Sequence, residues 1–186
     1  SGSAWQPAFA AADPTATRGT IGRLLQPGQS FSQTFTVDSM LNQFFTFAAM
    51  VVPSNDFFIG NDSPTAFRLF DNAGNLVLGS IGQKASDIWD AGSEAFDPAA
   101  AAFVGNNGLR TDQNGVVSFN FTELDGFNGL TTGANYIFDS QLSASSDVYR
   151  ISFQAVPEPE TLPLMATALL AVLGLSRRRR VEAAVR

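Results

Sequence analysis

The chain has 186 residues, a length typical of one domain, and a formal net charge of −6. It contains neither cysteine nor histidine, which excludes disulfides, thiol nucleophiles, Ser-His-Asp hydrolysis and zinc sites with Cys or His ligands. Five of the 11 basic and one of the 17 acidic side chains lie in residues 161–186, so residues 1–160 carry a net charge of −10. An acidic body repels nucleic acid and favours divalent cations, so we predict no nucleic-acid partner.

Residues 1–23 are rich in Ala, Pro and Thr, and we expect this segment to be extended or partly disordered. Residues 24–155 show short strand signals instead. Residues 31–37 alternate polar and apolar side chains, and residues 44–52 form a continuous apolar run that is typical of a central strand covered on both faces. Frequent Gly and Asn between such runs predict an all-β domain.

The second half of this region continues the pattern. Residues 67–70 and 76–78 flank a turn at residues 71–75, which lacks the distal Glu of an EF-hand and is interpreted as a plain turn. Alternating apolar residues predict two further strands, around Phe119 and Ile151. Several short strands with regular turn signals predict an antiparallel β-sandwich.

Two long segments interrupt the strand pattern, and loops of this kind are where binding residues usually lie. Residues 85–103 carry Trp89 and an alanine run and predict a long loop with a short helix, whereas residues 124–135 are Gly-rich and turn-like.

Two stretches resemble the paired signature of the spondin N-terminal domain, including its bacterial members. The first reads AMVVPSNDFFIG at residues 49–60, and the second reads WDAGSE at residues 89–94. The resemblance covers about residues 24–155. It implies a C2-like β-sandwich of an extracellular matrix or surface protein, with calcium held by acidic loops at one end. The family domain usually begins further upstream, so the resemblance predicts a shortened or N-terminally incomplete version here.

By the same resemblance, the family's metal ligands correspond to Asp56, Asp90 and Glu94, which we call the predicted calcium ligands. Glu94 stands where the family has Asp, and a carboxylate is retained. Calcium prefers six to eight oxygen ligands and needs neither His nor Cys, and Gly92 lets the chain turn between Asp90 and Glu94. The alternative is that these aspartates are ordinary turn or helix-cap residues that make Asx hydrogen bonds.

The C-terminal region combines three unlike elements in a fixed order. The short motif Val156-Pro157-Glu158-Pro159 precedes an uncharged, largely apolar segment at residues 161–176, and a basic cluster follows it, formed by Arg177, Arg178, Arg179 and Arg180. This order resembles the PEP-CTERM sorting signal of bacterial exported proteins, over residues 156–180. It implies processing by an exosortase-type enzyme.

The chemistry of the tail agrees with this resemblance. Sixteen helical residues span about 24 Å, which approaches the thickness of the bilayer core, so we predict a transmembrane helix at residues 161–176. Arginines are retained on the cytoplasmic side, which would leave residues 181–186 as a cytoplasmic tail and everything before Pro157 outside. The alternative is a buried or amphipathic helix, but its polar face is missing. The chain opens without a charged and then apolar leader, so we expect any signal peptide to have been removed or left out.

Two function classes follow from these patterns. The first is a non-catalytic protein, held at the inner membrane as a precursor and then placed at the cell surface or outside the cell for adhesion or contact with matrix or extracellular polysaccharide. The second is a carbohydrate-active enzyme that uses paired carboxylates, such as Asp56 with Asp90 or Asp90 with Glu94, as acid and base. The sequence favours the first, because Trp5, Trp89 and two tyrosines are few for a sugar-stacking cleft.

Overall fold

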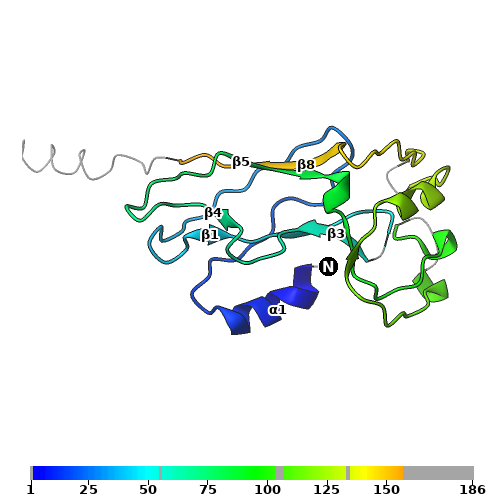
Figure 1. Cartoon of the computed structure of the whole chain (residues 1–186), viewed down its shortest axis with the longest axis horizontal. Helices are drawn as coiled ribbons and strands as arrows, with labels where there is room; N and C mark the ends of the chain where they lie inside the picture. The colour runs from blue at the N-terminus through cyan, green and yellow to red at the C-terminus, as the bar shows by residue number, and fades with distance from the viewer. Residues whose placement is uncertain (1, 55, 104–106, 133–134, 157–186) are drawn as a thin grey trace, which may run out of the picture. The chain divides into compact units, whose positions relative to one another are not determined.

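The computed structural model describes residues 2–54, 56–103, 107–132 and 135–156. The chain divides into two compact units, residues 1–154 and residues 155–186. The first unit is built mostly from short antiparallel strands with few helices, as the sequence predicts (Figure 1). The predicted transmembrane helix at residues 161–176 lies outside the described residues.

Helix α1 (Gly2–Ala12) occupies part of the segment that we expected to be extended or partly disordered. Alanine has the highest helix propensity, and the run at residues 10–12 extends the helix to its last residue. Pro14 follows shortly afterwards and disfavours helical backbone at Asp13, the residue before it. Residues 13–23 lie outside helices and strands.

Within the described residues, eight strands form three antiparallel sheets. The strands are β1 (Phe44–Phe45), β2 (Ala48–Met50), β3 (Phe57–Gly60), β4 (Phe67–Arg68), β5 (Ser80–Lys84), β6 (Trp89–Asp90), β7 (Ser118–Phe119) and β8 (Asp147–Ser152). The order is β1-β4 in one pair, β2-β3-β6-β7 in the largest sheet, and β5-β8 in the second pair. Four 3-10 helices lie between the strands: η1 (Ala85–Asp87), η2 (Pro98–Ala100), η3 (Asn107–Leu109) and η4 (Thr122–Phe127).

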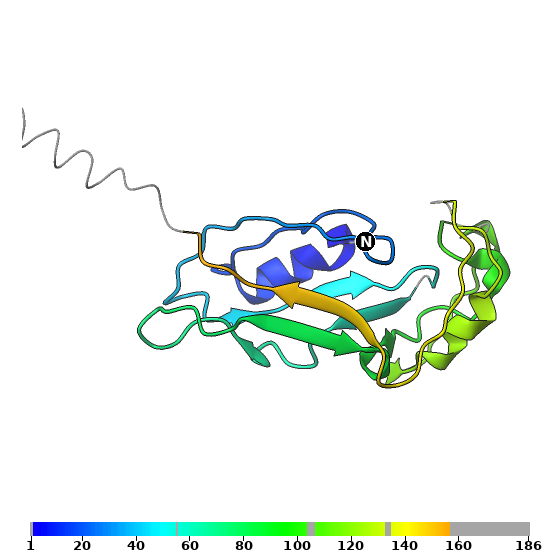
Figure 2. The ribbon, with the colours of Figure 1, turned by 90° about the horizontal axis from the view of Figure 1, so that it is seen from above.

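The β5-β8 pair lies on one side of β1, β3 and β4, and α1 lies on the other side of these strands (Figures 1 and 2). Aromatic rings connect the two layers. Phe45 meets Phe153 edge-on with ring centroids 4.9 Å apart, and Phe47 stacks on Tyr149 at 6.5 Å. Two layers of antiparallel strands with aromatic side chains between them are compatible with a sandwich.

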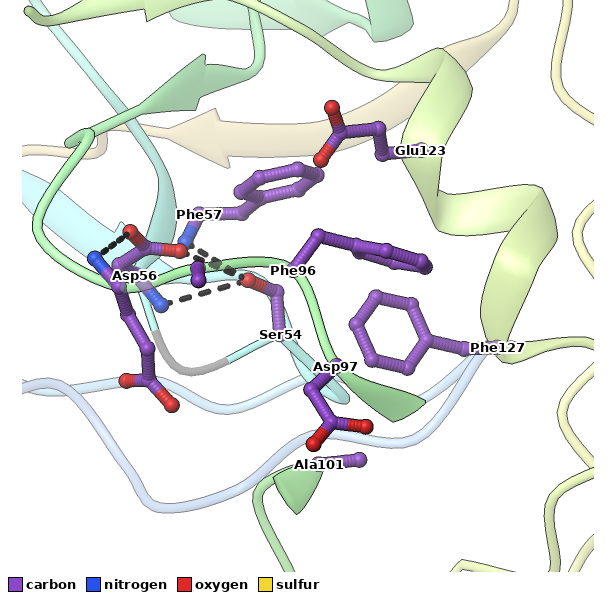
Figure 3. Close-up of a pocket in the computed structure, with 10 residues that line it drawn as sticks. Ser54, Asp56, Phe57, Phe96, Asp97, Ala101, Glu123 and Phe127 are labelled. Carbon is purple, nitrogen blue, oxygen red and sulfur yellow. Dashed lines mark hydrogen bonds between the residues drawn. The ribbon is translucent and has the colours of Figure 1, made fainter. Parts of the chain in front are cut away.

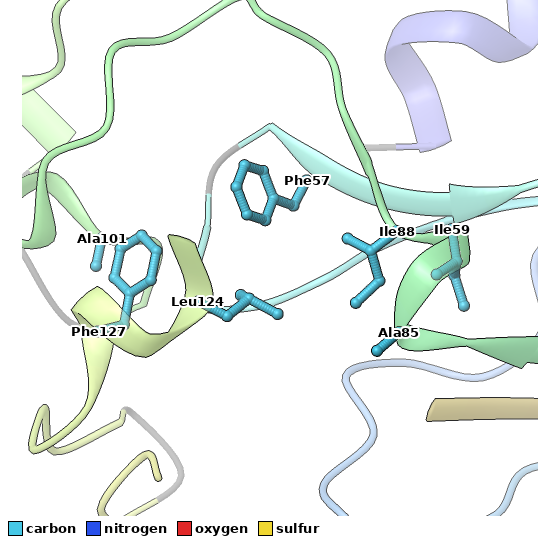
Figure 4. Packing of buried hydrophobic residues seen from close by; sticks show 7 residues of the cluster. All are labelled: Phe57, Ile59, Ala85, Ile88, Ala101, Leu124 and Phe127. Atoms are coloured by element: carbon cyan, nitrogen blue, oxygen red, sulfur yellow. The ribbon is translucent and has the colours of Figure 1, made fainter. Parts of the chain in front are cut away.

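The buried apolar core extends from these layers to the acidic loops (Figure 4), and Phe47 and Tyr149 pack against it. Its buried members come from β3, η1, the loop around η2, and η4; they are Phe57, Ile59, Ala85, Ile88, Ala101, Leu124 and Phe127. The Gly-rich stretch at residues 124–135, predicted as turn-like, therefore begins inside a 3-10 helix that contributes two core side chains. The predicted short helix within residues 85–103 is confirmed as 3-10 turns.

Two strand predictions were wrong in detail. Residues 31–37 belong to no strand among the described residues, and the rings of Phe31 and Phe35 lie against Gly22 and Gly19 instead. Residues 44–52 divide into β1 and β2, which pair with different partners. The division falls at Phe47, whose N–H donates to the side-chain Oδ1 of Asn61 at 2.9 Å rather than to a neighbouring strand.

The turn at residues 71–75 is confirmed as a plain turn. Both Ala73 N–H and Asn75 N–H donate to Oδ1 of Asp71, and the Asn75 amide donates to its Oδ2 at 3.0 Å. These hydrogen bonds, led by the one from the Asn75 side chain, hold the pKa of Asp71 below its usual value. The turn brings Phe70 and Leu76 into an antiparallel bridge.

Candidate functional site

Antiparallel pairing brings the two acidic motifs together. Strand β3 pairs with β6 so that Phe57 lies opposite Asp90, and the N–H of Ala91 donates to the carbonyl of Asp56 at 3.2 Å. Asp56 therefore lies just before β3, beside the loop that leaves β6. The two loops that the spondin resemblance brings together are therefore neighbours along the backbone.

The carboxylate of Asp56 accepts hydrogen bonds from the neighbouring loop. The N–H groups of Ser93 and Glu94 donate to its Oδ2 at 3.1 and 3.0 Å, and the Ser93 hydroxyl lies 3.4 Å from the same atom. The Ser54 hydroxyl donates to Oδ1 at 3.2 Å. The charge of Asp56 is thus met by main-chain donors that lie 37 and 38 residues further along the chain.

Asp90 holds the start of this loop in a local turn. Its Oδ1 accepts the N–H of Gly92 at 2.7 Å, the pattern of an Asx turn, and the Asn120 amide lies 3.5 Å from Oδ2. Gly92 has a φ of +64°, and a Cβ built there would lie 2.9 Å from backbone atoms of Val116. Only glycine fits this position without strain.

The side chain of Glu94 is largely buried, with 8% of it exposed. Its Oε2 lies 3.6 Å from Nε of Arg110, which is also 3.6 Å from Asp112 through another guanidinium nitrogen. Glu94 and Asp112 form an antiparallel bridge, which places Arg110 beside the acid. A guanidinium next to Glu94 supplies part of the positive charge that a cation would otherwise provide.

A small pocket of about 20 Å³ opens beside these residues (Figure 3). Its walls are Ser54, Asp56, Phe57, Glu94, Ala95, Phe96, Asp97, Ala101, Glu123 and Phe127. In Figure 3 the carboxylates of Asp56, Asp97 and Glu123 lie on different sides of the pocket, with aromatic rings between them. The space suits a water molecule or a small ion, but not a sugar ring.

The three predicted calcium ligands each contact other protein groups in this arrangement. Among the residues that the structure describes, no group of three or more Asp, Glu, His or Cys side chains is placed to hold a metal ion. The Asp56 carboxylate accepts two main-chain N–H groups, and Arg110 lies beside Glu94. The calcium assignment stays a prediction from the resemblance, while the Asx turn that we weighed against it is present at Asp90.

The opposite face of the same sheet carries an apolar row that the sequence did not suggest. Register places Met50, Phe58, Trp89 and Phe119 side by side across the four strands. Phe119 lies 3.9 Å from Trp89 between ring centroids, and Phe58 stacks on the other side at 6.3 Å. Trp89 therefore packs against its strand neighbours, and Phe119 covers one face of its indole ring.

The remaining predicted site is the tail. Val156 is 69% exposed, and the rest of the predicted sorting signal, from Pro157 through the four arginines, lies outside the described residues. Within the described part of the chain, none of the helices is both long and apolar enough to span a bilayer.

Residues 155–180 match the PEP-CTERM protein-sorting motif. This confirms the resemblance seen in residues 156–180, and it marks the chain as an exported, membrane-transiting precursor that an exosortase sorts. No curated protein and no solved structure matches the chain. The resemblance of residues 24–155 to the spondin N-terminal domain therefore has no support from these comparisons.

Proposed function

We propose that this protein is a non-catalytic surface or matrix protein, whose body is released from the inner membrane by exosortase and then makes contacts at the cell surface or outside the cell. The observation that carries the proposal is the sorting motif at residues 155–180. A chain with such a tail has its body on the outer side of the membrane, where adhesion and contact with matrix or polysaccharide take place. For the body we propose a sandwich of the C2-like kind.

The geometry of the acidic loops supports a non-catalytic body over the glycosidase alternative. A pair of carboxylates that cleaves a glycosidic bond needs room for a sugar between them. The pocket here has a volume of about 20 Å³. Asp56 accepts hydrogen bonds from the loop after β6 and so holds two loops together, whereas Asp90 accepts the N–H of Gly92 within its own loop.

The same contacts support a structural role for the acidic loops. Asp56 connects the loop before β3 to the loop after β6, and Arg110 connects the second loop to the residues before β7. Loops held in this way form one end of the domain with a fixed shape. A partner outside the cell would meet a preorganised surface there, which lowers the entropy lost on binding.

The sorting step is tested by replacing Pro157, Glu158 and Pro159 with alanine in the full chain. We expect the altered protein to stay in the inner-membrane fraction at precursor mass, whereas the unaltered protein leaves it and becomes shorter. A conservative change in the body, Asp62→Ala at an exposed loop residue, is the control. Normal maturation of the triple-alanine protein would refute the proposal.

A further inference from the structure

The sorting motif begins very close to the folded body. Strand β8 pairs with β5 up to Ser152 opposite Ser80, and the N–H of Phe153 then donates to the carbonyl of Gly79 at 2.9 Å. Only Gln154, Ala155 and Val156, all exposed, stand between Phe153 and Pro157. Three extended residues reach at most about 10 Å.

Phe153 is also held through its side chain. The ring is half-buried and meets Phe45 edge-on, with centroids 4.9 Å apart and an interplanar angle of 76°. Phe45 in turn stacks on Phe47 at 5.8 Å, and Phe47 stacks on Tyr149 within β8 itself. The end of β8 is therefore fixed by a main-chain hydrogen bond and by an aromatic cluster.

An enzyme that cuts or transfers at a peptide bond takes its substrate as an extended segment with residues on both sides of that bond. Strand addition of this kind uses the main-chain groups that β8 gives to β5. Residues paired with β5 would have to leave it before an enzyme could bind them in that way.

We propose that release of Phe153 from Gly79 and Phe45 controls how fast the exosortase processes this protein. The inference rests on the proposed sorting function and adds its regulation. The end of a strand opens more easily than its middle, and cleavage of an opened state follows the population of that state when opening and closing are fast. Phe153 is thus a positioning residue, because it sets how much chain the enzyme can take up.

Two variants of the full chain test this, in cells that carry the cognate exosortase. The first inserts six Gly and Ser residues between Gln154 and Ala155, which lengthens the free segment and leaves β8 intact. The second is Phe153→Ala, which removes the ring contact with Phe45. Pulse-chase labelling follows the conversion of precursor to mature protein by mass, and we expect both variants to convert about tenfold faster than the unaltered chain.

The matched control is Phe138→Ala. Phe138 is also half-buried and packs against the core cluster of Phe57 and Phe127, but its N–H donates to the carbonyl of Leu130 and not to β5. Its removal loosens the body without lengthening the free segment, so we expect an unchanged rate. If Phe138→Ala accelerates conversion as much as Phe153→Ala does, global loosening is responsible and the inference is wrong.

Failure of the inference and failure of the sorting function are distinguishable. Equal conversion of the unaltered, insertion and Phe153→Ala chains, together with a block when residues 157–159 become alanine, overturns the control by Phe153 and leaves the sorting function in place. Normal conversion of the alanine-substituted motif overturns both. The insertion variant keeps the test decisive even if Phe153→Ala does not fold.

Discussion

Replacing Asp56 with alanine should separate the two loops that its carboxylate connects. Oδ2 of Asp56 accepts the N–H groups of Ser93 and Glu94, and Oδ1 accepts the Ser54 hydroxyl. The substitution removes every one of these acceptors. It also leaves the Glu94 N–H without its charged partner in a half-buried position.

The expected loss follows from the two main-chain bonds. Hydrogen bonds to a charged acceptor contribute about 1.5–3 kcal/mol each, and the half-buried setting of Asp56 argues for the lower value, so the pair is worth about 3 kcal/mol. For a domain of this size, that loss lowers the melting temperature by about 6–12 °C. Asp56→Asn keeps one acceptor oxygen of the same reach and should lose only about 1 kcal/mol.

Urea unfolding monitored by tryptophan fluorescence measures both losses, because Trp89 lies in β6 next to the affected loop. Asp62→Ala is the matched control, since Asp62 is an exposed loop acid, and it should stay within about 0.5 kcal/mol of the unaltered protein. A loss below about 0.5 kcal/mol for Asp56→Ala would show that these hydrogen bonds do not support the fold.

Three further predictions concern the same loops and the turn at residues 71–75. Calcium bound by the predicted ligands would stabilise the fold by about 2.7 kcal/mol at a hundred times Kd. The assignment therefore predicts a higher melting temperature in millimolar calcium than in EGTA, and equal melting temperatures would refute it. Gly92→Ala should lower the free energy of unfolding by at least about 2 kcal/mol, because φ is positive there and the new Cβ would lie 2.9 Å from the backbone of Val116. Gly28 also has a positive φ but has open space around it, so Gly28→Ala should lower it by only about 1 kcal/mol in the same urea unfolding assay. Because the pKa of Asp71 is lowered in the folded state, its turn stabilises the fold above the unfolded pKa, and this stability is lost as the pH falls through the folded pKa. Carboxyl NMR should show a pKa of Asp71 below the usual aspartate value, and Asn75→Ala should raise this pKa.

The sorting of the chain could be predicted from the sequence, because its signal is local. The order of a Pro-Glu-Pro motif, an apolar segment and four arginines is complete within residues 156–180 and needs no folding to be recognised. The absence of cysteine and histidine likewise removes whole classes of chemistry at once. Turns follow the same rule: residues 71–75 form the predicted turn because Asp71 bonds to groups at most four positions away.

The acidic site could be predicted only in part. The resemblance to the spondin domain implied that Asp56 and the loop at Asp90 meet, and the pairing of β3 with β6 places Phe57 opposite Asp90. It could not indicate what each carboxylate contacts there. The donors to Asp56 lie 37 and 38 residues away, and Arg110 reaches Glu94 only because residues 93–95 run antiparallel to residues 111–113.

Long-range pairing also decided which apolar runs became strands. Residues 31–37 alternate as a strand should, yet among the described residues they have no strand partner, whereas the run at residues 44–52 divides because Asn61 takes the N–H of Phe47. An alternating pattern indicates only which side chains share a face. A strand also needs a second strand at hydrogen-bonding distance. The tertiary fold supplies that second strand. The sorting tail and the turns could therefore be predicted from local sequence, whereas the strand pairing and the contacts of the acidic side chains are visible only in the three-dimensional structure.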